Sequence, residues 1–216
     1  MRNRSSDERR SGSRTTAGVT LAVAALAGAF TIASAGGSAS GHGWEAVAVL
    51  RDVAGNKVGK VKFEGDGNGT VVKATLNGVT VGLDGYHGFH LHANDAMEPC
   101  NAAPPSPPPP APPAGPFTNV GGHWNPTGAV HGSHSGDLPS IQVLLDGTGS
   151  ARSVTGRFEP SDIEGRAVIL HAGPDNFGNI PTRYVTGTPP VAGPDAATNA
   201  AGDAGGRIAC GIVELD

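Results

Sequence analysis

The stretch VGKVKFEGDGNGTVVKATLNGV, residues 58–79, decides the fold class of this chain. In its first half, apolar Val61 and Phe63 alternate with charged Lys60 and Lys62, which is the two-residue period of a half-buried strand. GDGNG follows, a strong signal for a tight turn, and the run after it is rich in Val and Thr. The stretch therefore predicts a β-hairpin with one face in the core and the other in solvent.

Short segments of the same kind lie on both sides of this hairpin, and turn residues separate them. No stretch after residue 35 keeps a sustained 3.6-residue hydrophobic period, the signal of an amphipathic helix. Several short strands at this spacing predict an antiparallel sandwich or barrel. The further strand candidates are EAVAVLRDV (45–53), GYHGFHLHA (85–93), the two halves of SIQVLLDGTGSARSVTGRFE (140–159) around its DGTG turn, GRAVILHA (165–172) and RIACGIVEL (207–215).

Two long loops interrupt the expected strands, at about residues 93–139 and 172–206. Loops of this length are unusual in a compact domain and tend to be functional. The first contains APPSPPPPAPPAGP, a proline-rich insertion at about residues 102–116. It predicts an extended surface segment, with recognition of a partner through its PxxP pattern as the alternative.

Six of the eight histidines lie in three segments, and the first is GFHLH. His90 and His92 are two residues apart on an expected strand, so both imidazoles leave the same face while Phe89 and Leu91 point into the core. Two adjacent imidazoles on one face suit a metal ion better than they suit packing. A pair of exposed surface histidines is the alternative.

The second segment, GGHWNPTGAVHGSHSGDLP, carries His123 and then His131, His134 and Asp137 at three-residue intervals. Zinc accepts imidazole and carboxylate ligands in a tetrahedron, and the glycines of this segment let a loop fold around an ion. A solvated histidine-rich loop is the alternative. The GSHSG within it is similar to a nucleophile elbow, but its central residue is His134 rather than serine, so a serine hydrolase has no support.

Together these motifs resemble the Cu/Zn superoxide dismutase family. GFHLH is similar to the family's G-F-H-x-H, GGHWNP to G-x-H-[FYW]-[ND]-P, HSGDLP to H-x-G-D-L, HAGPDN to H-x-x-x-D, and GDAGGRIACGI to the terminal G-N-A-G-x-R-x-A-C-G. The resemblance covers residues 45–215 and is nearest to exported bacterial, actinobacterial-like forms. It implies an all-β fold, an eight-stranded Greek-key β-barrel or sandwich (immunoglobulin-like) with two long functional loops.

The resemblance also implies roles for individual residues. Copper would be held by His90, His92, His123 and His171, and zinc by His123, His131, His134 and Asp137, with His123 bridging the two ions. Asp175 would hydrogen-bond one histidine of each set, Arg207 would lie at the mouth of the copper site, and Cys100 would be bonded to Cys210. His87 matches a position that supports the loop without binding metal, and His42 has no counterpart in the family.

The activity implied is conversion of superoxide to O₂ and hydrogen peroxide by Cu(II)/Cu(I) cycling, with Arg207 and His123 as the catalytic residues. Superoxide is a small anion, and Arg207 would supply the local positive charge that attracts it. His131 and His134 are closer in sequence than in many relatives, which leaves a copper-only dismutase as one alternative. A non-catalytic copper-binding or chaperone-like protein on the same barrel is the other.

The N-terminus predicts export. Five arginines precede an apolar run that ends in Ala33-Ser34-Ala35, a small-x-small cleavage pattern. We expect a cleaved signal peptide at residues 1–35, a flexible leader at 36–43 and one catalytic domain at 44–216, with a membrane anchor as the alternative to cleavage. The protein would be secreted, extracellular, periplasmic or in the cell envelope.

Charge and cysteine content agree with this location. The chain has 15 Lys+Arg and 19 Asp+Glu, and removal of residues 1–35 leaves 10 and 17, a formal charge of −7. An acidic chain without a run of Lys and Arg predicts no binding of nucleic acid. The sequence does not decide whether the protein forms a homodimer. In an oxidising compartment the only cysteines, Cys100 and Cys210, are expected to form a disulfide, with two free buried thiols as the alternative.

Overall fold

The computed structural model describes residues 44–80, 83–105, 114–186 and 189–216, all of which belong to one compact unit spanning residues 40–216. The predicted signal peptide, the predicted leader with His42, and most of the proline-rich insertion lie outside the described residues. Within the described part of the chain, no helix has the length and apolar character needed to span a membrane.

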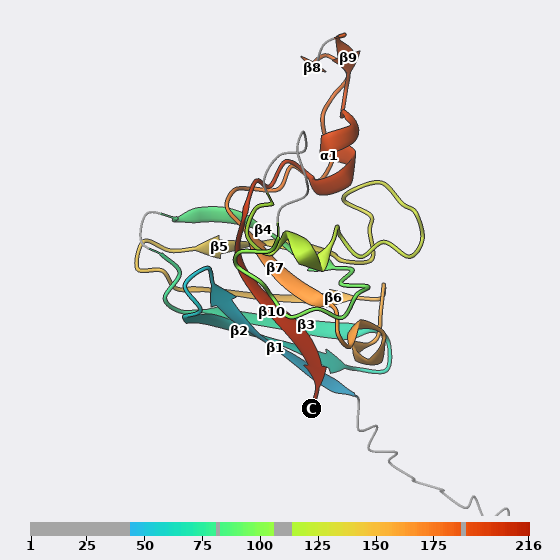
Figure 1. Cartoon of the computed structure of the whole chain (residues 1–216). Helices are drawn as coiled ribbons and strands as arrows, with labels where there is room; N and C mark the ends of the chain where they lie inside the picture. Colours follow the sequence, from blue (N-terminus) through green and yellow to red (C-terminus); the bar gives the residue numbers. More distant parts are fainter. Residues whose placement is uncertain (1–43, 81–82, 106–113, 187–188) are drawn as a thin grey trace, which may run out of the picture. The chain divides into compact units, whose positions relative to one another are not determined.

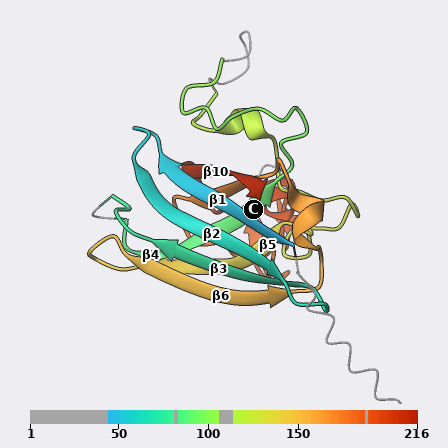
Figure 2. The same cartoon turned by 90° about the horizontal axis from the view of Figure 1, so that it is seen from below.

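Eight antiparallel strands form a single sheet, in the order β5-β4-β7-β10-β1-β2-β3-β6. The two ends of this order, β5 and β6, contact each other, so the sheet curls into a nearly closed barrel (Figure 1, Figure 2). The predicted all-β barrel is confirmed. Its strands are β1 (Glu45–Asp52), β2 (Lys57–Gly65), β3 (Thr70–Leu76), β4 (Gly85–His92), β5 (Asp137–Val143), β6 (Gly149–Thr155), β7 (Ala167–His171) and β10 (Arg207–Leu215).

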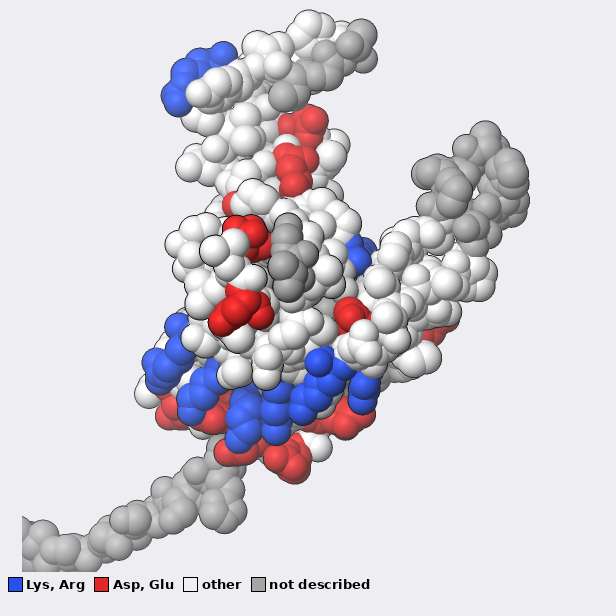
Figure 3. Space-filling view, turned by 90° about the vertical axis from the view of Figure 1, so that its left-hand side faces the viewer, with Lys and Arg blue, Asp and Glu red and all other residues white. Residues whose placement is uncertain are grey.

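The predicted hairpin is β2 and β3, paired antiparallel from Gly59 opposite Leu76 to Gly65 opposite Thr70. Val61 and Phe63 are fully buried, as their alternation with lysine predicts. Each such side chain contributes about 1.5–3 kcal/mol when it is removed from water. The charged side of the hairpin faces solvent, where Lys and Arg side chains gather in a band (Figure 3).

Short elements that hydrophobic periodicity did not predict lie in the two long loops and in the connection between β6 and β7. A 3-10 helix, η1 (Thr118–Val120), lies in the first loop, and a second one, η2 (Pro160–Ile163), joins β6 to β7. The loop at 172–206 contains the two-residue strands β8 (Val185–Thr186) and β9 (Val191–Ala192) and the helix α1 (Ala196–Ala201). Elements of two to six residues are too short to establish a hydrophobic period, so local capping marks them instead: Asp195 accepts a hydrogen bond from the Thr198 amide at 2.9 Å.

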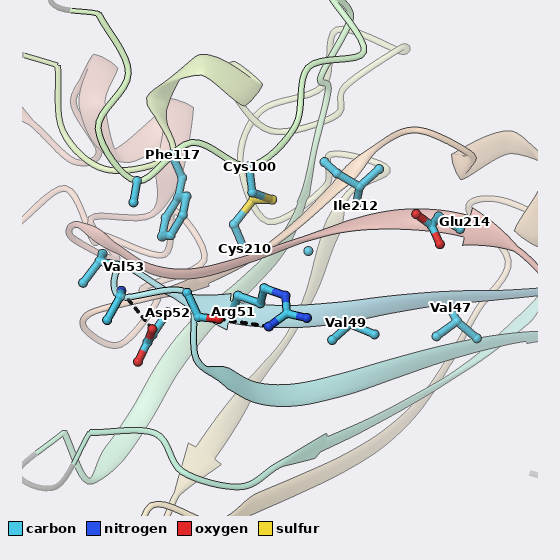
Figure 4. A pocket seen from close by; sticks show the side chains of 14 residues that line it. Val47, Val49, Arg51, Asp52, Val53, Cys100, Phe117, Cys210, Ile212 and Glu214 are labelled. Atoms are coloured by element: carbon cyan, nitrogen blue, oxygen red, sulfur yellow. Dashed lines mark hydrogen bonds between the residues drawn. A yellow bond between two sulfur atoms is a disulfide. The ribbon is translucent and has the colours of Figure 1, made fainter.

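The two cysteines form a disulfide, with Cα atoms 5.8 Å apart, so the alternative of two free thiols is wrong. Cys210 lies in β10, and the bond ties the first long loop to that strand. Phe117, Val120 and Ile169 pack around it as a second small core. Figure 4 shows the disulfide at one side of a groove of about 660 Å³ between the loop and the outer faces of β1 and β10.

Replacement of both cysteines by serine should lower the free energy of unfolding. The bond closes a loop with a sequence separation of 110 residues, for which the chain-entropy model gives about 4–5 kcal/mol. Urea unfolding of the oxidised protein and of Cys100→Ser/Cys210→Ser measures the difference. A difference below about 1 kcal/mol would show that the loop stays on β10 without the bond.

Candidate metal centre

Strand β4 presents the first two histidines. Its register places His90 opposite Asp137 of β5 and opposite Ile169 of β7, and His92 forms an isolated bridge with His123. Phe89 is buried in the main core, as expected, and both imidazoles are also fully buried. The alternative of exposed surface histidines is therefore wrong.

The structure brings all the predicted ligands together in two groups that share one residue. In each group the candidate ligand atoms lie within 4.8 Å of one another. A third group joins the two through a carboxylate. The groups are His90, His92, His123 and His171; His123, His131, His134 and Asp137; and His90, His131 and Asp175.

Unpartnered ring nitrogens test whether metal ions fit these groups. Buried polar atoms without a hydrogen-bond partner cost about 1–3 kcal/mol each, and a metal ion bound by such atoms would offset this cost. Four buried ring nitrogens of these groups form no close hydrogen bond, although two of them lie 3.3 Å from Asp137 Oδ1. They are His90 Nδ1, His123 Nε2, His131 Nδ1 and His134 Nδ1. Imidazole-rich and imidazole–carboxylate sets are the donors that copper and zinc accept.

Asp137 lies close to all three histidines of the second group. Its Oδ1 lies 2.9 Å from His123 Nδ1 and 3.3 Å from the Nδ1 atoms of both His131 and His134. Burial alone would raise the pKa of Asp137, but hydrogen bonds from His123 and His131 outweigh burial and hold that pKa well below its usual range. The carboxylate is therefore ionised, which is the form that binds a cation.

Asp175 orients one histidine of each set. Its two oxygens accept hydrogen bonds of 2.7 Å from His90 Nε2 and His131 Nε2, and its Oδ1 also accepts one from the Phe177 amide at 2.7 Å. Both Nδ1 atoms are thereby left to the metal groups. Gly202 makes room for this contact, because a Cβ there would overlap Asp175 Oδ1 and His131 Nε2, and its φ is 61°.

The backbone orients two further histidines. His92 Nδ1 donates to the Gly121 carbonyl at 2.9 Å and His171 Nδ1 donates to the Gly205 carbonyl at 3.1 Å. In a neutral imidazole this leaves the lone pair on Nε2, and the two Nε2 atoms face each other at 3.3 Å. Burial lowers the pKa of His171 to about 3 and holds that of His92 well below its usual value, so both rings are neutral at pH 7.

His90 and His131 differ in their protonation. Burial lowers the pKa of His90 to about 4, even though Asp175 accepts its hydrogen bond. Burial also acts to lower the pKa of His131, but hydrogen bonds to Asp137 and Asp175 outweigh burial and raise it to about 9. At pH 7 His131 therefore holds a proton between two carboxylates, and a metal ion at Nδ1 would replace that proton.

Arg207 lies at the start of β10, opposite His171 at the end of β7. Its Nη1 donates to the Phe117 carbonyl at 2.5 Å and its Nη2 to the Gly121 carbonyl at 2.6 Å. The Gly121 carbonyl thus contacts both Arg207 and His92. Burial lowers the pKa of Arg207 to about 10, so the guanidinium stays charged at neutral pH.

His87 belongs to neither group. Its ring nitrogens lie 2.7 Å from the carbonyls of His171 and Leu83, so the ring links the end of β7 to the turn before β4. This agrees with the supporting role that the resemblance implies.

Sequence reasoning missed Arg157. Its Nη1 donates to the carbonyls of His134 at 2.9 Å and Asp137 at 3.0 Å, and its Nη2 donates to that of Gly132 at 3.2 Å. The guanidinium therefore gathers three carbonyls of the loop that carries the second group. Arg157 lies 20 to 25 residues further along the chain than its acceptors, so no local motif could reveal it.

Asp175→Asn should weaken the binding of both metals. The asparagine amide offers one acceptor oxygen, so the Nε2–H of either His90 or His131 loses its partner and that ring loses its orientation. Loss of such a partner typically costs 10–100-fold in metal affinity. Competition with a chelator measures the affinities for copper and zinc, with Asp146→Asn in an exposed turn as the matched control. Equal affinities in all three proteins would contradict this role for Asp175.

Comparison with known proteins agrees with the geometry. The family model described as copper/zinc superoxide dismutase (SODC) matches residues 57–213. The chain is 40% identical over 164 residues to the superoxide dismutase [Cu-Zn] of Mycolicibacterium paratuberculosis, covering 74% of this chain and 69% of that protein. It is 42% identical over 166 residues to that of Mycobacterium tuberculosis, covering 74% of this chain and 65%, just under two thirds, of that protein.

Among solved structures, Cu/Zn superoxide dismutase from Brucella abortus matches with a TM-score of 0.57 and 25% identity, covering 79% of this chain and 99% of that one. The clock protein EA4 matches with a TM-score of 0.56 at 23% identity, covering 80% and 95%, and shows the shared fold alone. The matched family model spans most of the barrel and includes every residue of the two histidine groups. The chain therefore belongs to the copper/zinc superoxide dismutase family.

Proposed function

We propose that this chain is an exported superoxide dismutase that converts two superoxide anions and two protons into O₂ and hydrogen peroxide. One observation carries the proposal. His123 belongs to both groups: its Nδ1 lies 2.9 Å from Asp137 Oδ1, and its Nε2 is buried without a hydrogen-bond partner among the described residues. A single imidazole placed between two ion sites suits a paired centre in which one ion is redox-active and the other holds the ring.

The donor sets assign the ions. His90 Nδ1 and the Nε2 atoms of His92, His123 and His171 would hold copper, which supplies one-electron redox chemistry when bound. The Nδ1 atoms of His123, His131 and His134 with the Asp137 carboxylate would hold zinc, which has no redox chemistry and prefers four such ligands. A carboxylate beside three imidazoles favours zinc over the copper-only alternative.

Arg207 binds and orients the substrate. The chain is acidic, so its net charge repels a small anion, and the attraction must come from a local positive charge. Two carbonyl acceptors hold the guanidinium in place opposite His171. This arrangement also argues against the non-catalytic alternative, because mere copper storage needs no half-buried arginine beside the ligands.

His123 moves the proton. Its Nδ1 is held by the Asp137 group, while its Nε2 has no hydrogen-bond partner among the described residues. Whenever Nε2 is not holding copper, its lone pair would take up one proton, which it would then donate to the reduced oxygen species, while solvent supplies the second proton of the peroxide.

Export is supported by the disulfide, because such bonds persist in oxidising compartments and are rare in the cytosol. Cleavage of the predicted signal peptide at residue 35 and the division into a leader and a domain remain part of this proposal.

Elemental analysis of the purified holoprotein, combined with a superoxide assay, tests the function directly. We expect one copper and one zinc per chain and dismutation near the diffusional limit, which superoxide dismutases approach. Full activity with copper but no zinc would show that the protein is the copper-only dismutase. Full copper loading with superoxide decaying at its spontaneous rate would show that the protein binds copper without catalysis.

Arg207→Ala should lower kcat/KM for superoxide at least several-fold, about 1 kcal/mol or more of transition-state stabilisation, and leave copper content unchanged. The loss should shrink as ionic strength rises, because salt screens the attraction of the native arginine. Pulse radiolysis measures the rates, with Arg207→Lys expected in between and Arg183→Ala as an exposed control. Unchanged dismutation by Arg207→Ala would remove Arg207 from the mechanism.

A further inference from the structure

The outer face of β1, β2, β3 and β6 collects the free positive charge of the barrel. It carries every lysine of the chain, together with two arginines, and Figure 3 shows Lys and Arg side chains as a continuous band. We call this surface the lysine face. Its residues are Arg51, Lys57, Lys60, Lys62, Lys73 and Arg152.

Strand register places these cations directly opposite one another. Lys62 of β2 faces Lys73 of β3, and Lys73 in turn faces Arg152 of β6. Arg51 of β1 faces Lys57 of β2. Like charges in directly opposed positions destabilise a sheet by roughly 0.2–1 kcal/mol per pair. The face thus keeps three repulsive pairs in a chain whose overall charge is negative.

Carboxylates neutralise only part of this charge. Glu64 lies 2.5 Å from Lys73, and Glu45 lies 3.8 Å from Lys62. Lys57, Lys60 and Arg152 form no ion pair with the described residues. Exposed pairs of this kind contribute little stability, so the face retains a net positive charge that the fold does not use.

The sequence hides this surface. The lysines are spread over residues 57–73 with acidic and apolar residues between them, and Arg152 lies far along the chain. Only the pairing of four strands collects them on one side. The chain therefore has no run of Lys and Arg along its sequence, yet strand pairing gathers these cations on one side of the barrel.

We infer that the lysine face binds a linear acidic polysaccharide outside the cell. Neighbouring strands lie about 4.8 Å apart and alternate residues of one strand about 7 Å apart, so the cations form a band with short, regular spacings that can follow the carboxylates or sulfates of a polymer. No exposed aromatic side chain of β2, β3 or β6 offers a base-stacking platform, which nucleic-acid binders of this kind use. The inference rests on the proposed export but not on dismutation.

Such binding would tether the protein without blocking its centre. The four strands of the lysine face carry none of the predicted metal ligands, which lie on β4, β5, β7 and the loops. A polymer along this face leaves Arg207 free to attract superoxide. The inferred role is therefore retention of the protein in an anionic polysaccharide layer.

Affinity measurements with heparin and polygalacturonate as probes test the inference on the full-length mature protein. We expect both to bind at low salt, and Lys62→Gln/Lys73→Gln/Arg152→Gln to bind at least tenfold more weakly. The slope of log affinity against log salt should fall by roughly two to three for the three lost contacts. Copper content and dismutase activity should match the unsubstituted protein, which separates this test from that of the enzyme.

Matched single variants control for net charge. Lys60→Gln removes one positive charge from the lysine face, and Arg183→Gln removes one elsewhere. Only the first should weaken binding. No binding of either polysaccharide, or equal weakening by both variants, would overturn the inference. Tighter binding of duplex DNA or of phosphatidylglycerol vesicles, with the same sensitivity to the triple variant, would also overturn it in favour of that partner.

Discussion

The structure depends on burying six imidazoles side by side while keeping most of them in the neutral form. Burial favours the neutral ring, and the pKa of His90 falls to about 4 and that of His171 to about 3 as a result. Four of the six rings have a hydrogen-bond acceptor at one ring nitrogen. Backbone carbonyls serve His92 and His171, while Asp175 serves His90 and His131. The other ring nitrogens of these four residues are left for the two candidate metal groups.

The barrel and the loops divide this task. Strands β4 and β7 place three of the imidazoles through their register, and hydrogen bonds from the loops then orient these rings. The Gly121 carbonyl provides one, because it accepts hydrogen bonds from both His92 and Arg207. The disulfide provides another, because it holds the segment that ends near Phe117 against β10, where Arg207 begins. Arg207 and the proposed copper ligand His92 are thus positioned by the same stretch of loop.

A feature could be predicted from the sequence when it depends on residues that are close together in the chain, and not when it depends on residues that are far apart. Alternation along residues 58–76 predicts β2 and β3 because one side chain in two must enter the core. The ligand motifs predict the centre because metal chemistry restricts residue types. Arg157 was missed because it contacts residues 20 to 25 positions earlier in the chain. The helix α1 was missed because it has only six residues and is marked by its cap rather than by a hydrophobic period. The lysine face was missed because it depends on the register of four strands. None of these leaves a periodic signal.

Arg157 also explains how a short loop can hold three candidate ligands in place. Only two residues separate His131 from His134, so the loop has little chain with which to pack against the barrel. Instead, Asp137 Oδ2 accepts hydrogen bonds from the amides of Gly132 at 2.7 Å and His134 at 3.0 Å, and Arg157 binds three carbonyls of the same turn. The loop therefore has its amides and its carbonyls satisfied before any ion binds. Preorganisation of this kind reduces the ordering cost of binding, so the short loop need not mean a weak zinc site.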